Sequence, residues 1–272
     1  MTKVQETLLS FYDTCNRDEY KEIKSEKLDL PPPNWDDIRL AMLKIMEAKV
    51  IGIDTETTGL DVLNDGEIRL IQVATKDKTF VFDFYDYDFD QKKFICNILL
   101  NRVEAVKVFH NAMFDILMMR PYARMERSDF KIFDTQVAEK IIDCGLSRKG
   151  FGLKDVAKKY LGIEMSKEEQ ASNWAAKVLT REQVEYAIKD AEITLALYEP
   201  MKKKLEEMNL IKPFNIDINA IVPLAEITWT GIYLDFEEWN KLNEQFKAKY
   251  IELEAKIKAM LSNQTINLNS SS

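Results

Sequence analysis

An apolar segment over residues 49–54 runs directly into two acidic residues, Asp54 and Glu56. Side chains alternate between the faces of a strand, so these two carboxylates share one face. Two acids at the end of a strand built for burial repel each other unless a positive group lies between them, and a divalent cation with oxygen ligands meets that need. The alternative is an ordinary polar strand end followed by a turn at residues 57–59. We expect this strand to be central in a sheet, with a metal site at its end.

A second apolar strand, over residues 105–109, leads into another polar cluster with His110, Asn111 and Asp115. Asn111 is a candidate cap for a helix over 112–120, which would place Asp115 about one turn inside that helix. On the alternative interpretation, Asp115 only complements the helix dipole. Because two strands end in acids that point toward the same sheet edge, a shared site is favoured.

A third acid stands in a helix predicted over residues 181–208. Tyr186 and Asp190 are four residues apart and therefore lie on one face of that helix. Asp is a poor helix former, so its place in the interior needs a reason. The alternative is a solvated acid beside Lys189 and Glu192.

Strand and helix signals alternate along the first half of the chain. The expected elements are a helix over 34–48, a hairpin with strands over 68–75 and 79–84, a helix over 89–101 and a strand over 130–133. This alternation after a hairpin predicts a mixed, mainly five-stranded α/β sheet with helices on both faces. From residue 133 onward the pattern is almost wholly helical.

Composition excludes several classes of protein. The 272 residues carry a formal charge of -8, which argues against a broad basic surface for nucleic acid. Any grip on phosphate should be local and made through metal ions. No apolar run is long enough to span a membrane, and the N-terminus lacks the pattern of a secretory signal, so we expect a cytoplasmic protein. The three cysteines, Cys15, Cys96 and Cys144, are far apart and predict free thiols.

Three segments are expected. Residues 1–33 form a charged extension that ends in three prolines, 34–212 form the α/β domain, and 213–272 form a helical extension with a charged amphipathic helix over 237–260. From the polar sequence at its C-terminal end, we expect the chain to be part of a longer protein.

The three spacings D-x-E, N-x-x-x-D and Y-x-x-x-D, in this order, resemble the DEDD superfamily of 3'-5' exonucleases, in the subclass with tyrosine in the third motif. The resemblance covers about residues 35–210 and includes residues 152–154, 160–162, 167–174 and 179–180. The stretch is similar to ribonuclease D and to the proofreading domains of family A DNA polymerases. It implies a ribonuclease H-like fold in which two Mg²⁺ or Mn²⁺ ions are held by four acids, while Tyr186 orients the attacking water. Those acids are Asp54, Glu56, Asp115 and Asp190.

The chemistry suits these residue types. Two cations held by hard oxygen ligands generate a nucleophile at neutral pH and stabilise the leaving 3' oxygen. Tyr186, with an ordinary phenol pKa near 10, is better suited to a hydrogen bond than to the role of base. The subclass with a histidine base is excluded, because His110 is the single histidine and lies in the second motif.

The resemblance also suggests substrate contacts at positions that match similar enzymes: Thr57, Leu60, Asn111, Lys167 and Gln170. Thr57 is alternatively a turn residue and Leu60 a core residue. Trp174 is a candidate for stacking on a base or for core packing. We expect Asp134 to cap a helix and His110 to pack or hydrogen-bond.

Residues 225–235 and 266–270 resemble the link from a proofreading domain into the thumb of a family A DNA polymerase. This favours DNA over RNA as substrate, with a single strand or a frayed primer 3' end as partner and a polymerase domain in the full-length or split protein. One alternative is an RNA-trimming exonuclease like ribonuclease D. Another is a catalytically silent module that only binds nucleic-acid ends.

Overall fold

The computed structural model describes residues 34–64, 66–125, 131–146, 150–165, 172–261 and 265–268. The expected extension over 1–33 therefore lies outside the described residues. Within them, no helix combines the length and the apolar character that crossing a bilayer requires. Cys96 is buried and Cys144 exposed, and both are free thiols as predicted.

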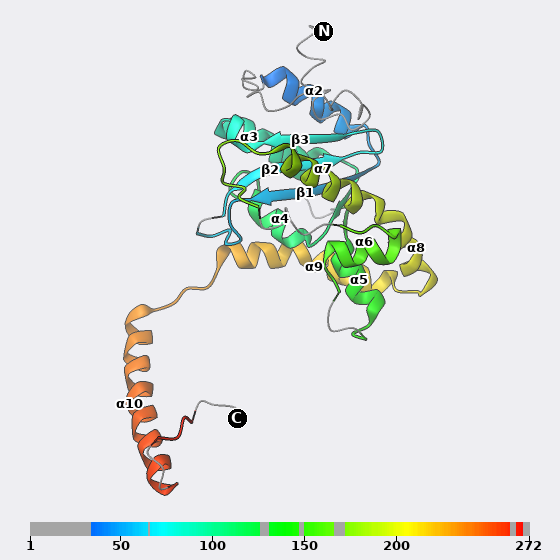
Figure 1. Cartoon of the computed structure of the whole chain (residues 1–272). Helices are drawn as coiled ribbons and strands as arrows, with labels where there is room; N and C mark the ends of the chain where they lie inside the picture. Colours follow the sequence, from blue (N-terminus) through cyan, green and yellow to red (C-terminus); the bar gives the residue numbers. More distant parts are fainter. Residues whose placement is uncertain are drawn as a thin grey trace. The chain divides into compact units, whose positions relative to one another are not determined.

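The sheet has five strands in the order β3-β2-β1-β4-β5, so the strand that ends in two acids is central (Figure 1). The strands are β1 (Val50–Thr57), β2 (Ile68–Ala74), β3 (Thr79–Asp83), β4 (Val106–Phe109) and β5 (Ile132–Asp134). β1 pairs antiparallel with β2 and parallel with β4, and β5 extends the parallel part. The predicted mixed sheet of ribonuclease H-like type is confirmed.

A tight turn closes the β2–β3 hairpin. The Thr75 N–H donates to the Lys78 carbonyl at 2.8 Å, and the Lys78 N–H donates to the Thr75 hydroxyl at 3.1 Å. All residues of β2 are buried, which is typical of a strand that is covered on both faces.

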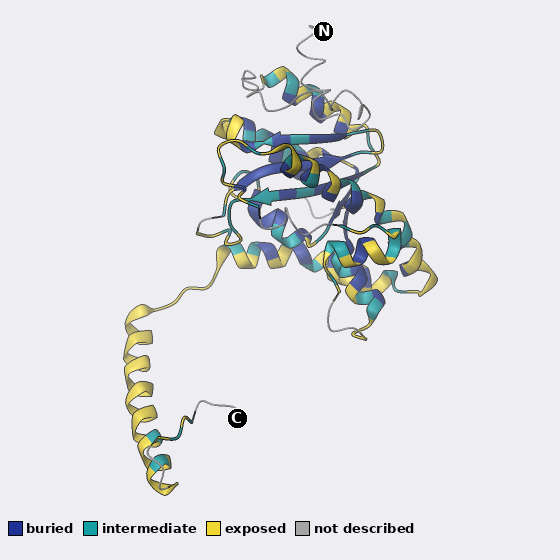
Figure 2. Ribbon diagram, in the orientation of Figure 1, coloured by how far each residue is buried: buried dark blue, intermediate teal, exposed yellow. Residues whose placement is uncertain are grey.

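Helices flank the sheet (Figures 1 and 2). Their bounds are α2 (Trp35–Met46), α3 (Phe89–Asn97), α4 (Ala112–Met119), α5 (Thr135–Asp143), α6 (Leu153–Leu161), α7 (Arg181–Ala196), α8 (Tyr198–Glu207) and α9 (Ile211–Thr230). The helix predicted over 89–101 ends in a five-residue π-helical stretch, Ile98–Arg102.

The single helix predicted over 181–208 is wrong, because the chain forms two helices, α7 and α8. Pro200 lies in the first turn of α8 and has no N–H to continue the hydrogen bonds of α7. The break lets Tyr198 pack edge-on against Phe133, with ring centroids 5.0 Å apart. Met201 and Leu205 are buried on the same helix.

The expected boundary after residue 212 falls in the first turn of α9. The compact unit that contains the sheet continues to Trp229, and α9 contributes Phe214, Ile218 and Ile221 to its core. A bond between the Arg120 Nε and the Glu226 carboxylate, at 2.8 Å, joins α9 to α4.

The second unit begins at Thr230 and contains α10 (Phe236–Met260). The Asp235 carboxylate caps this helix by accepting from the N–H groups of Glu237 and Glu238. None of the residues of α10 is buried (Figure 2).

Candidate active site

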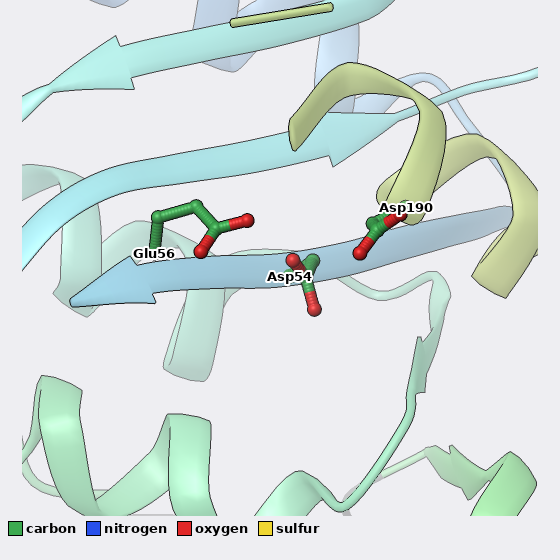
Figure 3. A group of neighbouring side chains, drawn as sticks. All are labelled: Asp54, Glu56 and Asp190. Atoms are coloured by element: carbon green, nitrogen blue, oxygen red, sulfur yellow. The ribbon is translucent and has the colours of Figure 1, made fainter. Parts of the chain in front are cut away.

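The central strand and α7 bring three carboxylates together (Figure 3). Asp54 and Glu56 project from one face of β1, and Asp190 comes from α7, which covers that face. One carboxylate oxygen from each residue lies within 4.8 Å of the other two. The three acids come from two sequence motifs, and the fold assembles them into one cluster.

Gly52 allows α7 to approach β1 this closely. It lies on the same face as Asp54, two residues earlier in the strand. A Cβ at this position would lie 2.4 Å from the Ala191 carbonyl oxygen and 2.8 Å from the Leu195 Cβ. Only a glycine fits there without moving the helix, and Ala191 directly follows Asp190. The missing side chain at position 52 therefore sets the distance of the third acid from the strand.

The fourth predicted acid, Asp115, lies beside this cluster in a different setting. It is buried in the first turn of α4 and accepts a hydrogen bond from the Thr55 hydroxyl at 2.7 Å. Thr55 alternates with Asp54 and Glu56 along β1, so this bond ties Asp115 to the same strand end. The charge of Asp115 raises the pKa of both Asp54 and Glu56.

The cap predicted at Asn111 is wrong. Its backbone is left-handed, with φ 73°, and its side chain makes no capping bond to α4. The buried carboxylate of Asp134 caps instead, accepting from the N–H groups of Asn111 at 3.2 Å and Ala112 at 2.7 Å. It also caps α5, as predicted, by accepting from the N–H groups of Gln136 and Val137. One carboxylate thus fixes the N-termini of two helices, including the one that carries Asp115.

His110 lies next to this double cap. Its Nδ1 is 2.8 Å from the Thr135 hydroxyl, which donates to the Phe109 carbonyl at 3.1 Å. Burial lowers the pKa of His110 to about 4, so the ring is neutral at physiological pH. The hydrogen-bonding role expected for this residue is present in the structure.

The acids of the site share strongly raised pKa values. Burial, and then the charges of Asp190 and Asp115, raise the pKa of Glu56 to about 9. Burial raises the pKa of Asp115 and of Asp190 to about 7, and it raises the pKa of Asp54 well above its ordinary value. At neutral pH Glu56 therefore keeps its proton, and Asp115 and Asp190 are about half protonated, unless a bound cation replaces these protons.

The donor set suits a divalent cation. All of its ligand atoms are carboxylate oxygens, the type that Mg²⁺ and Mn²⁺ prefer. One oxygen of Asp190, Oδ1, is buried without a hydrogen-bond partner among the described residues. The residues of this site therefore fit the metal that the motifs imply.

Tyr186 stands one turn before Asp190 on α7, and its hydroxyl is hydrogen-bonded to the Asp190 carboxylate. Burial, and then the charge of Asp190, raise the pKa of the phenol further above its ordinary value of 10. The hydroxyl therefore stays protonated across the physiological range and serves as a donor.

The residues considered as substrate contacts lie in different settings. The Thr57 hydroxyl donates to the Gly59 carbonyl at 2.8 Å, which is a turn interaction. Leu60 is 84% exposed, so the alternative that placed it in the core is wrong. Lys167 and Gln170 lie outside the described residues. Trp174 is buried with Leu70 and Ala187, in agreement with the core interpretation.

Two polar residues near the site were missed by sequence reasoning, although both interrupt the apolar strand β2. Arg69 is buried and binds the Asp83 carboxylate at 2.8 Å and the Ala176 carbonyl, which joins the 172–180 segment to the sheet. Gln72 is the Cα partner of Asp54 across the antiparallel pair. The polar character of these two residues, within a strand that is otherwise apolar, is the sequence signal that could have identified them.

Comparison with known proteins gives the following matches. A family model described as 3'-5' exonuclease matches residues 36–206. Ribonuclease D of Bartonella henselae is 28% identical over 171 residues, which is 63% of this chain and 40% of that protein. DNA polymerase I of Pseudomonas aeruginosa is 27% identical over 246 residues, which is 84% of this chain and 26% of that protein. The chain thus spans about two fifths of this ribonuclease D and about a quarter of this DNA polymerase.

Among solved structures, NrnC of Brucella melitensis bound to pGG is 26% identical with a TM-score of 0.60. The match covers 71% of this chain and 92% of that chain. The same protein has also been solved with bound Mg²⁺.

Proposed function

Since the chain belongs to the 3'-5' exonuclease family of the DEDD superfamily, we propose that it removes nucleotides one at a time from the 3' end of a DNA strand. The observation that carries this proposal is the cluster of Asp54, Glu56 and Asp190, whose carboxylate oxygens lie within 4.8 Å of one another. A module that only binds nucleic-acid ends gains nothing from three repelling acids at this distance. Metal-dependent hydrolysis, in contrast, requires such a group of carboxylate ligands.

Four acids hold two Mg²⁺ or Mn²⁺ ions in this proposal. Asp54, Glu56 and Asp190 form one ligand group, and Asp115 adds a carboxylate that Thr55 orients through its hydroxyl. When bound, such ions supply a nucleophile at neutral pH and stabilise the charge on the leaving 3' oxygen.

Tyr186 acts as a hydrogen-bond donor at this site. Its hydroxyl is bound to the Asp190 carboxylate, and its raised pKa keeps the proton on the phenol. Because its one O–H is donated to Asp190, the phenol oxygen orients the attacking water by accepting a hydrogen bond from it, and Tyr186 is not the base that accepts the proton. Leu60, which is exposed, and Asn111, whose side chain is not used as a cap, are the described residues proposed to contact the terminal nucleotide, together with Thr57.

DNA is the proposed substrate because the similarity to a DNA polymerase extends further along the chain. The match to the polymerase of Pseudomonas aeruginosa includes 84% of this chain, whereas the match to ribonuclease D includes 63%. We therefore propose that the chain is the proofreading part of a family A DNA polymerase. It would act on a single strand or a frayed primer 3' end.

The test compares DNA and RNA oligonucleotides of one sequence, each labelled at the 5' end. Progressive shortening of the DNA in Mg²⁺, and none in a chelator, is the expected result. Asp190→Asn should abolish it, because one ligand of the cluster is weakened. Glu185→Gln is the matched control, since it changes an exposed acid on the same helix.

Other outcomes would redirect the proposal. Preferential shortening of RNA would assign the chain to the ribonuclease D type of activity. Tight binding of 3' ends without hydrolysis would assign it to a silent end-binding module. Full activity of Asp190→Asn would remove the carboxylate cluster from the mechanism.

A further inference from the structure

Gln72 is a buried amide that no packing argument explains. It lies in the middle of β2, between the buried residues Ile71 and Val73, and its exposure is 0%. Neither its Nε2 nor its Oε1 has a hydrogen-bond partner among the described residues. Leaving a buried polar group unpaired costs about 1–3 kcal/mol. An apolar residue would serve the strand better, so a function other than stability has to account for the glutamine.

The position of Gln72 provides that function. Its Cα partner across the antiparallel pair is Asp54, and directly opposed residues project to the same face of a sheet. Their Cβ atoms are about 4.5–5.5 Å apart in such pairs, so the amide and the carboxylate are within side-chain reach. The face they share is the one that α7 covers.

Other polar atoms on α7 are also unpaired. Asp190 Oδ1 and Thr194 Oγ1 are buried without a partner among the described residues, and these two residues are one helical turn apart. The interface between β2 and α7 thus concentrates hydrogen-bonding groups beside the carboxylate cluster. Of these residues, only Gln72 offers an amide N–H, which is a donor to a carboxylate.

We propose that Gln72 is a positioning residue, whose amide N–H donates to the Asp54 carboxylate and fixes its orientation when cations are bound. The inference rests on the proposed function of the same site. It assigns to Gln72 the task that polar residues around a metal site perform, which is to hold a ligand in its binding geometry. Removal of such partners weakens metal affinity by about 10 to 100-fold.

The deciding variant is Gln72→Met, which keeps the volume of the side chain and removes its polar atoms. Two interpretations of Gln72 predict different metal affinities for this variant: a buried amide that only destabilises the fold, and an amide that positions Asp54. If the amide were only a burden, the variant would gain stability and bind metal as before. On our proposal it gains stability in a chelator, yet binds Mn²⁺ about 10 to 100-fold more weakly.

Mn²⁺ binding is measured by calorimetric titration of the whole chain, with unfolding in urea recorded on the same samples. Thr194→Val is the matched control, because it removes a different unpaired buried polar group, a hydroxyl, from the same interface. It should leave Mn²⁺ affinity unchanged. At saturating Mn²⁺, the single-turnover rate of Gln72→Met should return to most of the wild-type rate, and its KM for DNA should equal that of the wild type.

The outcomes separate the two levels of inference. Wild-type affinity in Gln72→Met, while Asp190→Asn loses binding, would overturn the role of Gln72 and leave the proposed function intact. Equal weakening in Thr194→Val would also overturn it, since a general packing effect would then explain the loss. Failure of the wild-type chain to bind Mn²⁺ would overturn both. If Gln72→Met does not fold, Gln72→Leu is used for the same comparison.

Discussion

The charge of Glu56 should make the metal-free protein lose stability as the pH rises. The pKa of this residue is about 9 in the folded state against an ordinary value of 4.5. Between these two values the folded protein holds a proton that the unfolded chain has released. A raised pKa of this kind contributes stability that is fully present below about 4.5 and is lost as the pH rises toward 9.

The size of the effect follows from proton linkage. One proton of difference changes the free energy of unfolding by about 1.4 kcal/mol for each pH unit. From pH 5 to pH 8, Glu56 therefore costs up to about 4 kcal/mol. Glu56→Gln cannot ionise, so its stability relative to the wild type should rise by up to that amount across the same interval.

The assay is urea unfolding at pH 5, 6, 7 and 8 in a chelator. Glu47→Gln removes an exposed acid directly after the C-terminal end of α2 and serves as the control, whose curve should run parallel to that of the wild type. Excess Mn²⁺ at pH 8 should restore wild-type stability by about 2.7 kcal/mol at 100 times the Kd, and should restore Glu56→Gln far less. Parallel curves for Glu56→Gln and the wild type would refute the reasoning.

Three further predictions concern groups around the cluster. Tyr186→Phe should slow single-turnover hydrolysis by about 10 to 1000-fold, which corresponds to a loss of about 1.4–4 kcal/mol of transition-state stabilisation. The acidic limb of its pH–rate profile should stay in place. Loss of that limb would show that Tyr186 is the base. Gly52→Ala should cost about 1–3 kcal/mol and weaken Mn²⁺ binding, because its Cβ would collide with the Ala191 carbonyl. Gly152→Ala, where the nearest heavy atom is 3.6 Å away, is the control in the same thermal and titration assays, and equal effects of the two would contradict the packing argument. Asp134→Ala should cost about 1–4 kcal/mol in urea unfolding, since two helix caps worth about 0.5–2 kcal/mol each are lost; a change confined to the range of one cap would show that the second contributes little.

The carboxylate cluster was predictable because its signals are local. Alternation along a strand places Asp54 and Glu56 on one face, and the spacing of four places Tyr186 above Asp190. Their roles in catalysis remain predictions. The sequence also indicated the central strand and the hairpin, since apolar runs and turn residues mark both.

Features that depend on distant pairing were not predictable. Asp134 caps α4 because the parallel pairing of β5 with β4 brings it opposite Phe109, and nothing near Asn111 in the sequence indicates this. Likewise, the apolar spacing of α9 predicted a helix but not that Phe214 and Ile218 would enter the core. The exposure of Leu60 could not be predicted for the same reason. An apolar residue after a strand is compatible with a place in the core until the residues around it are known.

The contact of α7 with β1 at Gly52 also dictates when this site can exist during folding. Asp54 and Glu56 lie on β1, whose antiparallel partner β2 follows it closely in the sequence, but Asp190 lies on a helix that follows every strand of the sheet. Contacts between such distant segments form late, and a ribosome would release α7 only after the whole sheet had been synthesised. A partly made chain therefore carries two acids of the cluster without the third. If the proposed function holds, cleavage would begin only once the domain is complete.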